Sequence, residues 1–161
     1  MRQIALFGKR GSGKFAFVSD DDFVFVSQSR WRVNAQGYVV RSVSKGGTKS
    51  VQYLHILIAA RNGIQNVGQQ LDHANCNKLD NTRDNLRLAT RQQNQANRGR
   101  PANNTSGFKG VSWNKQRGQF VANITVSKKT IYLGYFAEAA DAHAAYARAA
   151  IRYFGEYARS Q

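Results

Sequence analysis

The sequence is organised around one stretch, LDHANCNKLDNTRDNLRLATRQQNQANR, which occupies residues 71–98. Residues 71–73 fit the end of a strand, and the Asn- and Asp-rich run after them predicts a long turn. Residues 86–88 fit a second, returning strand. Thr90 and Gln93 have the spacing of a capping box, which predicts that a helix begins there. The stretch therefore predicts a β-β-α unit.

The predicted unit would gather a carboxylate, an imidazole and an amide. Asp72 and His73 end the first strand, and Asn94 lies in the first helical turn. Oxygen donors from Asp72 and Asn94 suit a hard cation such as Mg²⁺, and a histidine beside them can take a proton from water. This combination suits phosphodiester hydrolysis, because the metal neutralises charge at the leaving oxygen. The alternative is an Asn-rich surface loop in which His73 is only structural.

The same stretch resembles the motif of HNH endonucleases, especially those of the phage and intron homing type. The residues that carry the resemblance are Asp72, His73, Asn75, Asn77, Lys78, Asp80, Asn81, Asn85, Leu86, Arg87, Thr90 and Asn94. Asn85 follows His73 by 12 positions and Asn94 follows it by 21, as in that family. The resemblance implies a nuclease in which His73 is the general base. It also implies that Asp72 and Asn94 hold one divalent metal, Mg²⁺ or Mn²⁺, and that Asn85 braces the hairpin and orients His73.

The stretch departs from the family pattern at three positions. Ala74 and Cys76 stand where relatives more often carry Ile and Gly. Cys76 is therefore expected to strain a turn that prefers glycine. The last metal position is Asn94 rather than His, as in the phage subgroup, and an amide is the weaker ligand.

Residues 107–158 show a second pattern, of three strands followed by one helix. The strands are expected at 108–113, 119–126 and 130–134, and an alanine-rich helix at 137–154 with Gly155 as its stop. One face of the middle strand carries Phe120, Ala122, Ile124 and Val126. The helix stripe expected to cover that face consists of Ala139, Ala142, Tyr146, Ala149 and Tyr153. The opposite face of the sheet is then polar and uncovered.

This second pattern is similar to the DNA-binding domain of plant ethylene-response (Apetala-type) transcription factors and to the copies that follow HNH nucleases in phages. The similarity rests on residues 106–111, 118–124 and 133–136 and on the alanine-rich helix. It implies that the sheet enters the major groove of double-stranded DNA. Together with neighbouring basic residues, the expected DNA contacts are Lys109, Ser112, Trp113, Asn114, Lys115, Gln119, Asn123, Thr125, Lys128, Lys129, Tyr132, Arg87, Arg91 and Arg98. Packing at the sheet edge is an equal alternative for Trp113, and a solvated rim is the alternative for the lysines.

The first 68 residues form a β-rich region that we expect to support the nuclease motif. Strands are expected at 4–7, 15–19, 31–33, 38–42 and 49–53, and a helix at 54–61. The aspartates at 20–22 either cap a short helix or precede a buried strand. His55 is expected to be a buried structural residue, and His143 is expected to be exposed. The fold class is α+β, with a β-rich region at 1–68, the nuclease motif at 69–98, a linker at 99–106 and the sheet-and-helix domain at 107–158.

Charge indicates a nucleic acid as the partner. The 161 residues carry 24 Lys and Arg against 9 Asp and Glu, a formal net charge of +15. Residues 1–90 hold 13 basic and 6 acidic side chains and residues 91–161 hold 11 and 3, so both halves are expected to contact the polyanion. The single cysteine excludes an internal disulfide framework and a cysteine-rich zinc finger. No apolar run approaches the roughly 18 residues of a membrane span, so we expect a cytoplasmic protein that is not secreted.

These observations predict a metal-dependent endonuclease that hydrolyses double-stranded DNA and has no obligate protein partner. Two alternatives remain open. One is a sequence-specific DNA-binding protein with an inactive nuclease motif. The other is a basic protein that binds RNA.

Overall fold

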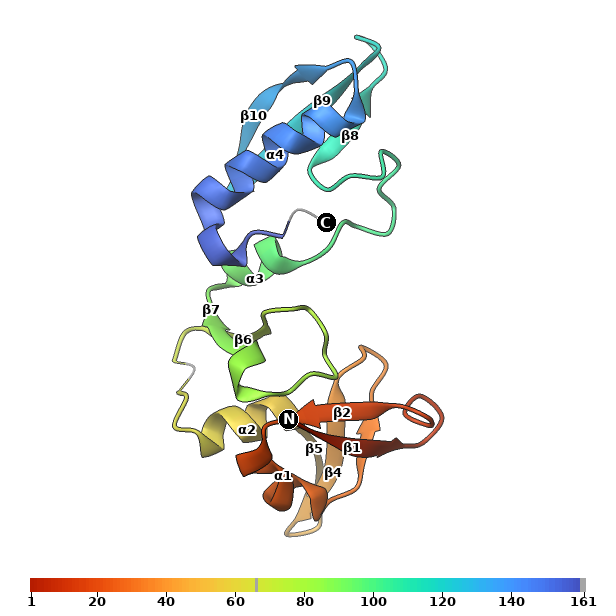
Figure 1. The fold of residues 1–161 in the computed structure, drawn as a ribbon, viewed down its shortest axis with the longest axis vertical. Helices are drawn as coiled ribbons and strands as arrows, with labels where there is room; N and C mark the ends of the chain where they lie inside the picture. Colours follow the sequence, from red (N-terminus) through yellow and green to blue (C-terminus); the bar gives the residue numbers. More distant parts are fainter. Residues whose placement is uncertain (66, 160–161) are drawn as a thin grey trace. The chain divides into compact units, whose positions relative to one another are not determined.

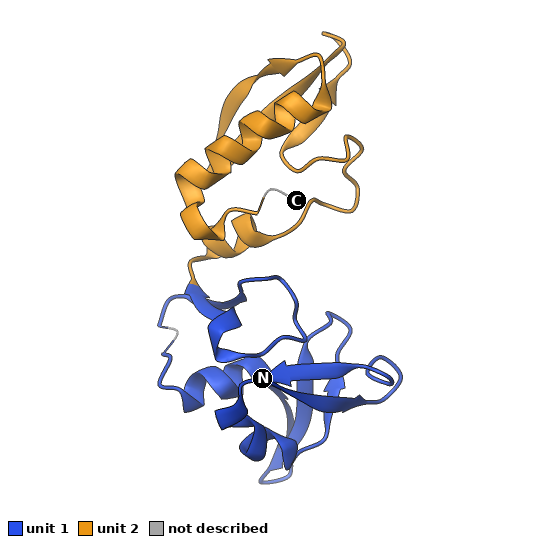
Figure 2. Cartoon of the chain, viewed as in Figure 1, with its two compact units in different colours: residues 1–88 blue, residues 89–161 orange. Residues whose placement is uncertain are grey.

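The computed structural model describes residues 1–65 and 67–159 (Figure 1). The chain divides into two compact units, unit 1 with residues 1–88 and unit 2 with residues 89–161 (Figure 2). Each unit has hydrophobic clusters of its own, and each is described by itself. Sheets and helices occur in both units, which confirms the α+β class.

A five-stranded sheet forms the frame of unit 1, in the order β2-β1-β3-β4-β5. Its strands are β1 (Arg2–Phe7), β2 (Phe15–Val18), β3 (Trp31–Val33), β4 (Val39–Lys45) and β5 (Thr48–Tyr53). Neighbouring strands are antiparallel, apart from the parallel pair β1 and β3. The strands expected from the sequence are therefore present, with bounds that differ by a few residues.

The two helices of unit 1 are α1 (Asp20–Ser27) and α2 (Leu54–Arg61). The three aspartates at 20–22 form the first turn of α1, so the helical alternative is confirmed and the buried-strand alternative is wrong. Carboxylates are favoured there by the positive end of the helix dipole. Trp31 is fully buried in the core of the unit, and its indole nitrogen donates a hydrogen bond to the carbonyl oxygen of Val26 at 2.8 Å.

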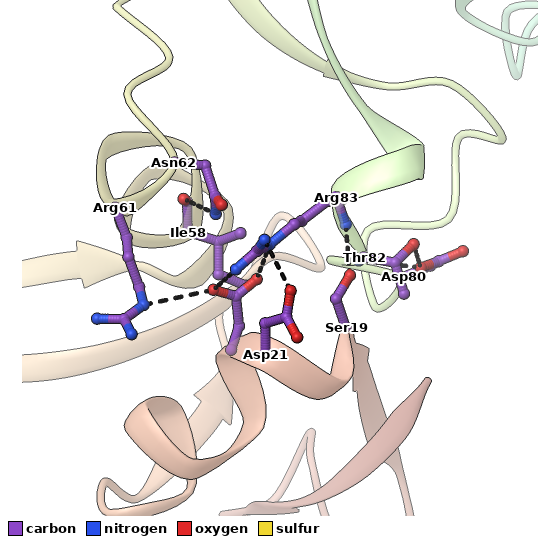
Figure 3. A network of polar contacts seen from close by, with 9 residues as sticks. Ser19, Asp21, Ile58, Arg61, Asn62, Asp80, Thr82 and Arg83 are labelled. Atoms are coloured by element: carbon purple, nitrogen blue, oxygen red, sulfur yellow. Dashed lines mark hydrogen bonds and ion pairs between the residues drawn. The ribbon is translucent and has the colours of Figure 1, made fainter.

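A network of polar contacts joins the start of α1 to Arg83 of the nuclease motif (Figure 3). Asp22 is fully buried, and Arg83 donates to both of its oxygens, from Nε to Oδ2 at 2.8 Å and from Nη2 to Oδ1 at 3.0 Å. Arg61 Nε lies 3.5 Å from Oδ1 of the same carboxylate. The backbone N–H of Arg83 also donates to Ser19 Oγ at 2.9 Å. This network fixes the short 3-10 helix η1 (Arg83–Asn85) to the N-terminal region.

The expected order of strand, turn, strand and helix is present along the nuclease motif. β6 (Gln70–His73) pairs with β7 (Leu86–Ala89). The intervening turn is joined to β2, because the Phe17 N–H donates to the Leu79 carbonyl oxygen at 2.8 Å. α3 (Arg91–Asn97) begins at Thr90, whose hydroxyl accepts from the Gln93 N–H while the Gln93 side chain accepts from the Thr90 N–H. The capping box is thus confirmed.

Unit 2 has a three-stranded antiparallel sheet in the order β10-β9-β8, with one long helix across it (Figure 1). Its elements after α3 are β8 (Val111–Asn114), β9 (Gln119–Val126), β10 (Lys129–Phe136), α4 (Ala139–Phe154) and η2 (Gly155–Tyr157). β8 begins three residues later than expected, because side chains hold the preceding segment in a turn. Ser106 Oγ donates to the Val111 carbonyl oxygen at 2.8 Å, and Asn104 Nδ2 donates to that of Phe108 at 2.9 Å.

The buried stripe of α4 differs from the expected one at its C-terminal end. The residues buried against the sheet are Ala142, Tyr146, Ala150 and Phe154, whereas Tyr153 is 42% exposed. Successive buried residues of α4 are four positions apart. The expected stripe instead continued from Tyr146 to Ala149, three positions further along. The packing of Tyr146 also requires glycine at position 110, since a Cβ there would lie 2.0 Å from the tyrosine ring. No helix among the described residues has the length and apolar character of a membrane span.

Candidate active site and nucleic-acid interface

Asp72 and His73 are adjacent buried residues at the end of β6, with 7% and 5% of their surface exposed. The turn that follows them is held by Asn85. Its Oδ1 accepts from the Asn75 N–H at 2.9 Å, and its Nδ2 donates to the carbonyl oxygen of Asp80 at 2.7 Å. Its own carbonyl oxygen accepts from the Ala74 N–H at 2.9 Å. Asn85 therefore stands where it can brace the hairpin.

The His73 ring is contacted by a different asparagine, Asn81. His73 Nε2 lies 3.4 Å from Oδ1 of Asn81, which is fully buried. Nδ2 of Asn81 donates to the Lys78 carbonyl oxygen at 3.3 Å, so its Oδ1 is the atom that faces the histidine. An amide oxygen only accepts hydrogen bonds, so this arrangement favours the tautomer with the proton on Nε2. The lone pair of His73 is then on Nδ1.

Burial keeps His73 uncharged. Desolvation lowers the pKa of His73 below its ordinary value of 6.5, although Asn81 and the carboxylates of Asp72 and Asp80 act in the opposite direction. A neutral imidazole can accept a proton at neutral pH, whereas an imidazolium cannot. The environment of His73 therefore suits a general base.

His55 is buried as expected, but it lies against His73, which the sequence did not indicate. The two ring centroids are 5.1 Å apart, and the rings meet edge to face at 67°. Tyr38 and Tyr53 complete a cluster of four rings, with centroids 5.2 Å and 5.5 Å from that of His55. Burial lowers the pKa of His55 to about 4, and a protonated His73 would act in the same direction. Neither the position of His55 in an apolar run nor its spacing from His73 signals this contact, because tertiary packing creates it.

Asp72 forms an ion pair with a residue that we expected to contact DNA. Its Oδ2 lies 3.3 Å from Nε of Arg87 on β7, and both side chains are largely buried. A carboxylate in this low-dielectric setting favours a cationic neighbour. The guanidinium of Arg87 is one such neighbour, and a metal ion would be a second.

The residues predicted to hold the metal belong to different units. Asp72 lies in unit 1, and Asn94 is a half-buried residue of α3 in unit 2. A carboxylate oxygen and an amide oxygen are hard donors, which fit Mg²⁺ or Mn²⁺. Within residues 1–65 and 67–159, no three His, Cys, Asp or Glu side chains form a group that could hold a metal ion. The convergence of Asp72 and Asn94 on one ion stays a prediction.

Cys76 has the strained backbone that the family comparison led us to expect. Its φ is +60°, in the left-handed region, and its N–H donates to the His73 carbonyl oxygen at 2.8 Å. Glycine adopts this conformation without steric cost. We expect Cys76→Gly to raise the free energy of unfolding by about 0.5–1 kcal/mol, the relief of strain minus the greater entropy of an unfolded glycine.

Urea unfolding measures this effect, and Asn77→Gly is a suitable control. Asn77 lies in the same turn, and its Oδ1 accepts from the Leu79 N–H at 3.1 Å. It is not among the residues with positive φ, so its replacement by glycine should destabilise the protein. If both variants lose the same amount of unfolding free energy, the Cys76 side chain stabilises the protein by more than the strain of its backbone destabilises it.

The sheet of unit 2 has one face that is polar, as expected. Across β8 and β9, Asn114 pairs with Gln119, and across β9 and β10, Asn123 pairs with Tyr132 and Thr125 with Thr130. The expected DNA contacts on this face are Ser112, Asn114, Gln119, Asn123, Thr125 and Tyr132. Lys115, Lys128 and Lys129 are exposed at or beside the two hairpin turns that join these strands.

Sequence reasoning missed Tyr135 and Arg117, which belong to the same surface. The guanidinium of Arg117 lies 4.6 Å from the centroid of the Tyr135 ring, and Asn114 Nδ2 donates to the Tyr135 hydroxyl at 3.4 Å. A β-bulge between Tyr132 and Gly134 shifts the alternation of β10 and brings Tyr135 to the polar face. Glycine within the strand was the available signal for this bulge.

Lys109 and His143 are placed differently from what we expected, and Trp113 takes the packing alternative. The Lys109 ammonium donates to carbonyl oxygens inside unit 2, at 2.6 Å to Arg98 and 3.1 Å to Arg159. Trp113 pairs with Phe120 on the helix side of the sheet, with ring centroids 4.8 Å apart, as its packing alternative predicts. The expectation that His143 is exposed is wrong, because the residue is half-buried with Nδ1 3.3 Å from the Lys109 carbonyl oxygen.

A cleft of about 1060 Å³ in unit 2 lies beside α3, residues 98–101 and β9. Two expected DNA contacts from the nuclease motif, Arg91 and Arg98, line it together with Arg100 and Lys128. Arg91, Arg98, Arg100 and Lys128 are themselves exposed. The cleft thus offers several cations to an anionic ligand.

The residues of the candidate active site fall inside a segment that matches a known family. Residues 52–96 match the family model described as HNH endonuclease. The segment contains Asp72, His73, Asn85 and Asn94 and also His55. This segment of the chain is thus similar to the HNH endonuclease family.

Two curated relatives are similar to longer parts of the chain. An uncharacterized HNH endonuclease, L560, of Acanthamoeba polyphaga mimivirus is 37% identical over 114 residues, which are 71% of this chain and 59% of the relative. Protein 3.8 of Escherichia phage T7 is 41% identical over 70 residues, which are 44% of this chain and 58% of the relative. The chain thus spans less than two thirds of either relative. No solved structure matches.

Proposed function

We propose that this protein is a metal-dependent endonuclease of the homing type that hydrolyses double-stranded DNA. The observation that carries the proposal is the buried pair of Asp72 and His73 at the end of β6, within the segment that matches the HNH endonuclease family. His73 is a neutral imidazole held by Asn81. A carboxylate next to such a base suits hydrolysis of a phosphodiester.

In the proposed reaction His73 is the general base. Nδ1 of His73 accepts a proton from water while the water oxygen bonds to phosphorus, and the bond from phosphorus to the leaving oxygen breaks. Asn81 keeps the second ring nitrogen protonated and thereby leaves the lone pair on Nδ1. Asp72 and Asn94 would hold one divalent metal, Mg²⁺ or Mn²⁺, which supplies charge neutralisation at the leaving oxygen.

We further propose that unit 2 binds the DNA through its polar sheet face, as its similarity to the Apetala-type domain implies. The paired Asn, Gln, Thr and Tyr side chains of β8, β9 and β10 support this role, since such side chains hydrogen-bond to base edges. The cations at the hairpin turns and in the cleft support contacts to phosphates. Lys109 and Trp113 are left out of this surface, because Lys109 donates to a carbonyl oxygen within the unit and Trp113 lies on the opposite face of the sheet, paired with Phe120.

One observation favours a second candidate, a DNA-binding protein with an inactive nuclease motif. The ion pair with Arg87 already engages one oxygen of Asp72. If Arg87 keeps this position in the DNA complex, Asp72 has less negative charge to offer a metal.

Cleavage of supercoiled plasmid separates the two candidates. We expect the full chain to convert the plasmid to nicked or linear DNA with Mg²⁺ or Mn²⁺ and to leave it intact with EDTA. Binding without cleavage in either metal would support the inactive candidate. Cleavage that persists in EDTA would contradict the proposal that the enzyme needs a metal. Tighter binding to duplex RNA than to duplex DNA across a salt series would contradict the proposal that its substrate is DNA.

A further inference from the structure

His55 belongs to the cluster of four rings in unit 1 and lies beside His73, the proposed general base. His55 lies in the first turn of α2, only 7% exposed, and presents no charge at neutral pH because its pKa is about 4. Its ring meets that of His73 edge to face at 5.1 Å. Tyr38 lies against both histidines, with its centroid 5.2 Å from His55 and 6.1 Å from His73. The His73 ring is therefore packed on one side and hydrogen-bonded to Asn81 at Nε2.

Nδ1 of His55 does not hold the ring in this place. Its Nδ1 is buried and has no hydrogen-bond partner among the described residues. A buried nitrogen without a partner destabilises a fold, so the ring is retained at a cost in stability. The contribution of His55 to this cluster is therefore the shape and aromatic surface of an uncharged ring.

We propose that His55 is a positioning residue, which fixes the plane of the His73 imidazole so that Nδ1 faces the attacking water. The inference rests on the proposed nuclease function. Asn81 contacts one ring nitrogen of His73, and the edge-to-face packing of His55 adds a restraint on rotation of the His73 ring about its Cβ–Cγ bond. A base must be held within a fraction of an ångström of its working geometry, and misplacement lowers the rate steeply.

The test compares a variant that removes the ring with one that keeps it. Under single-turnover conditions, His55→Ala should lower the rate constant of plasmid cleavage by about 10–100-fold with an unchanged Kd for duplex DNA. His55→Phe keeps an aromatic ring and removes the orphan nitrogen, so it should cleave close to the wild-type rate. Equal losses in both variants would overturn the proposal, because they would assign the effect to the nitrogen.

A cavity made elsewhere in the same helix is the control for general loosening. Ile58 lies one turn further along α2 and is 1% exposed. Ile58→Ala should leave the cleavage rate nearly unchanged at a temperature at which all variants are folded. A loss as large as that of His55→Ala would make His55 a merely structural residue and overturn the proposal.

An NMR measurement distinguishes failure of this proposal from failure of the nuclease function. Nitrogen-15 shifts of the imidazole report which ring nitrogen of His73 carries the proton, whether or not the protein cleaves DNA. We expect one Nε2-protonated form in the wild type and in His55→Phe. In His55→Ala the ring can rotate away from Asn81, so we expect a mixture of tautomers. An unchanged single form in His55→Ala would overturn the positioning role, whereas a wild type that keeps its ordered ring but cleaves nothing would count against the nuclease alone.

Discussion

Single-turnover cleavage of plasmid DNA is expected to fall by about 10²–10⁴-fold when His73 is replaced by alanine, which is the usual contribution of a general base. The variant lacks the one neutral imidazole that stands next to the predicted metal ligand Asp72. DNA binding should be unchanged, because His73 is buried and the proposed DNA contacts lie elsewhere. Filter binding in Ca²⁺ and cleavage in Mg²⁺ measure the two properties on the same preparation.

The matched control is the third histidine of the chain. His143 is half-buried in unit 2, where it contacts the Lys109 carbonyl oxygen and Phe108. His143→Gln should cleave at the wild-type rate. His73→Gln keeps a polar side chain of similar size and should be as inactive as His73→Ala, which separates loss of the base from loss of packing. A His73 variant that cuts as fast as the wild type would show that another group accepts the proton.

Local patterns in the sequence predicted the elements of both units. Alternation of apolar residues predicted β9 and its buried face, because side chains point to opposite sides of a strand at every step. The capping box at Thr90 and Gln93 predicted where α3 begins. The resemblance of residues 71–98 to the HNH motif implied that Asn85 braces the hairpin, and a motif within 28 consecutive residues keeps its partners close along the chain. Each of these features depends on residues that are near in sequence.

Contacts between distant residues were not predictable in this way. His55 is 18 residues from His73 and reads as an ordinary core position, yet the packing of α2 brings the rings together. From the sequence, Lys109 is expected to be a surface cation. Its ammonium instead donates to the carbonyl oxygens of Arg98 and Arg159, which lie near the two ends of unit 2 in the sequence. Asp22 reads as a helix-start residue, and its actual partner is Arg83, 61 positions away. Such pairings depend on the fold as a whole.

The pairing of Asp22 with Arg83 makes the stability of unit 1 sensitive to one surface-facing arginine. Arg83→Met should lower the free energy of unfolding, by less than the loss of a fully buried ion pair would, because the Arg83 side chain is 36% exposed. The cost arises at Asp22, whose carboxylate is fully buried and would keep, among the residues that the structure describes, only the ion pair with Arg61 at 3.5 Å. Asp22→Asn should cost less, because the amide is uncharged and its oxygen still accepts from Arg83.

Fluorescence of Trp31 during urea unfolding measures these changes, since Trp31 is fully buried in unit 1. A Trp113→Phe background removes the other tryptophan, which lies in unit 2. The control is Arg2→Met, which breaks an exposed pair with Asp20 on the same helix and should have little or no effect. The double variant Asp22→Asn with Arg83→Met should be more stable than Arg83→Met alone, because it no longer buries a charge. A double variant that is less stable than both single variants would show that Arg83 stabilises the unit through contacts other than Asp22.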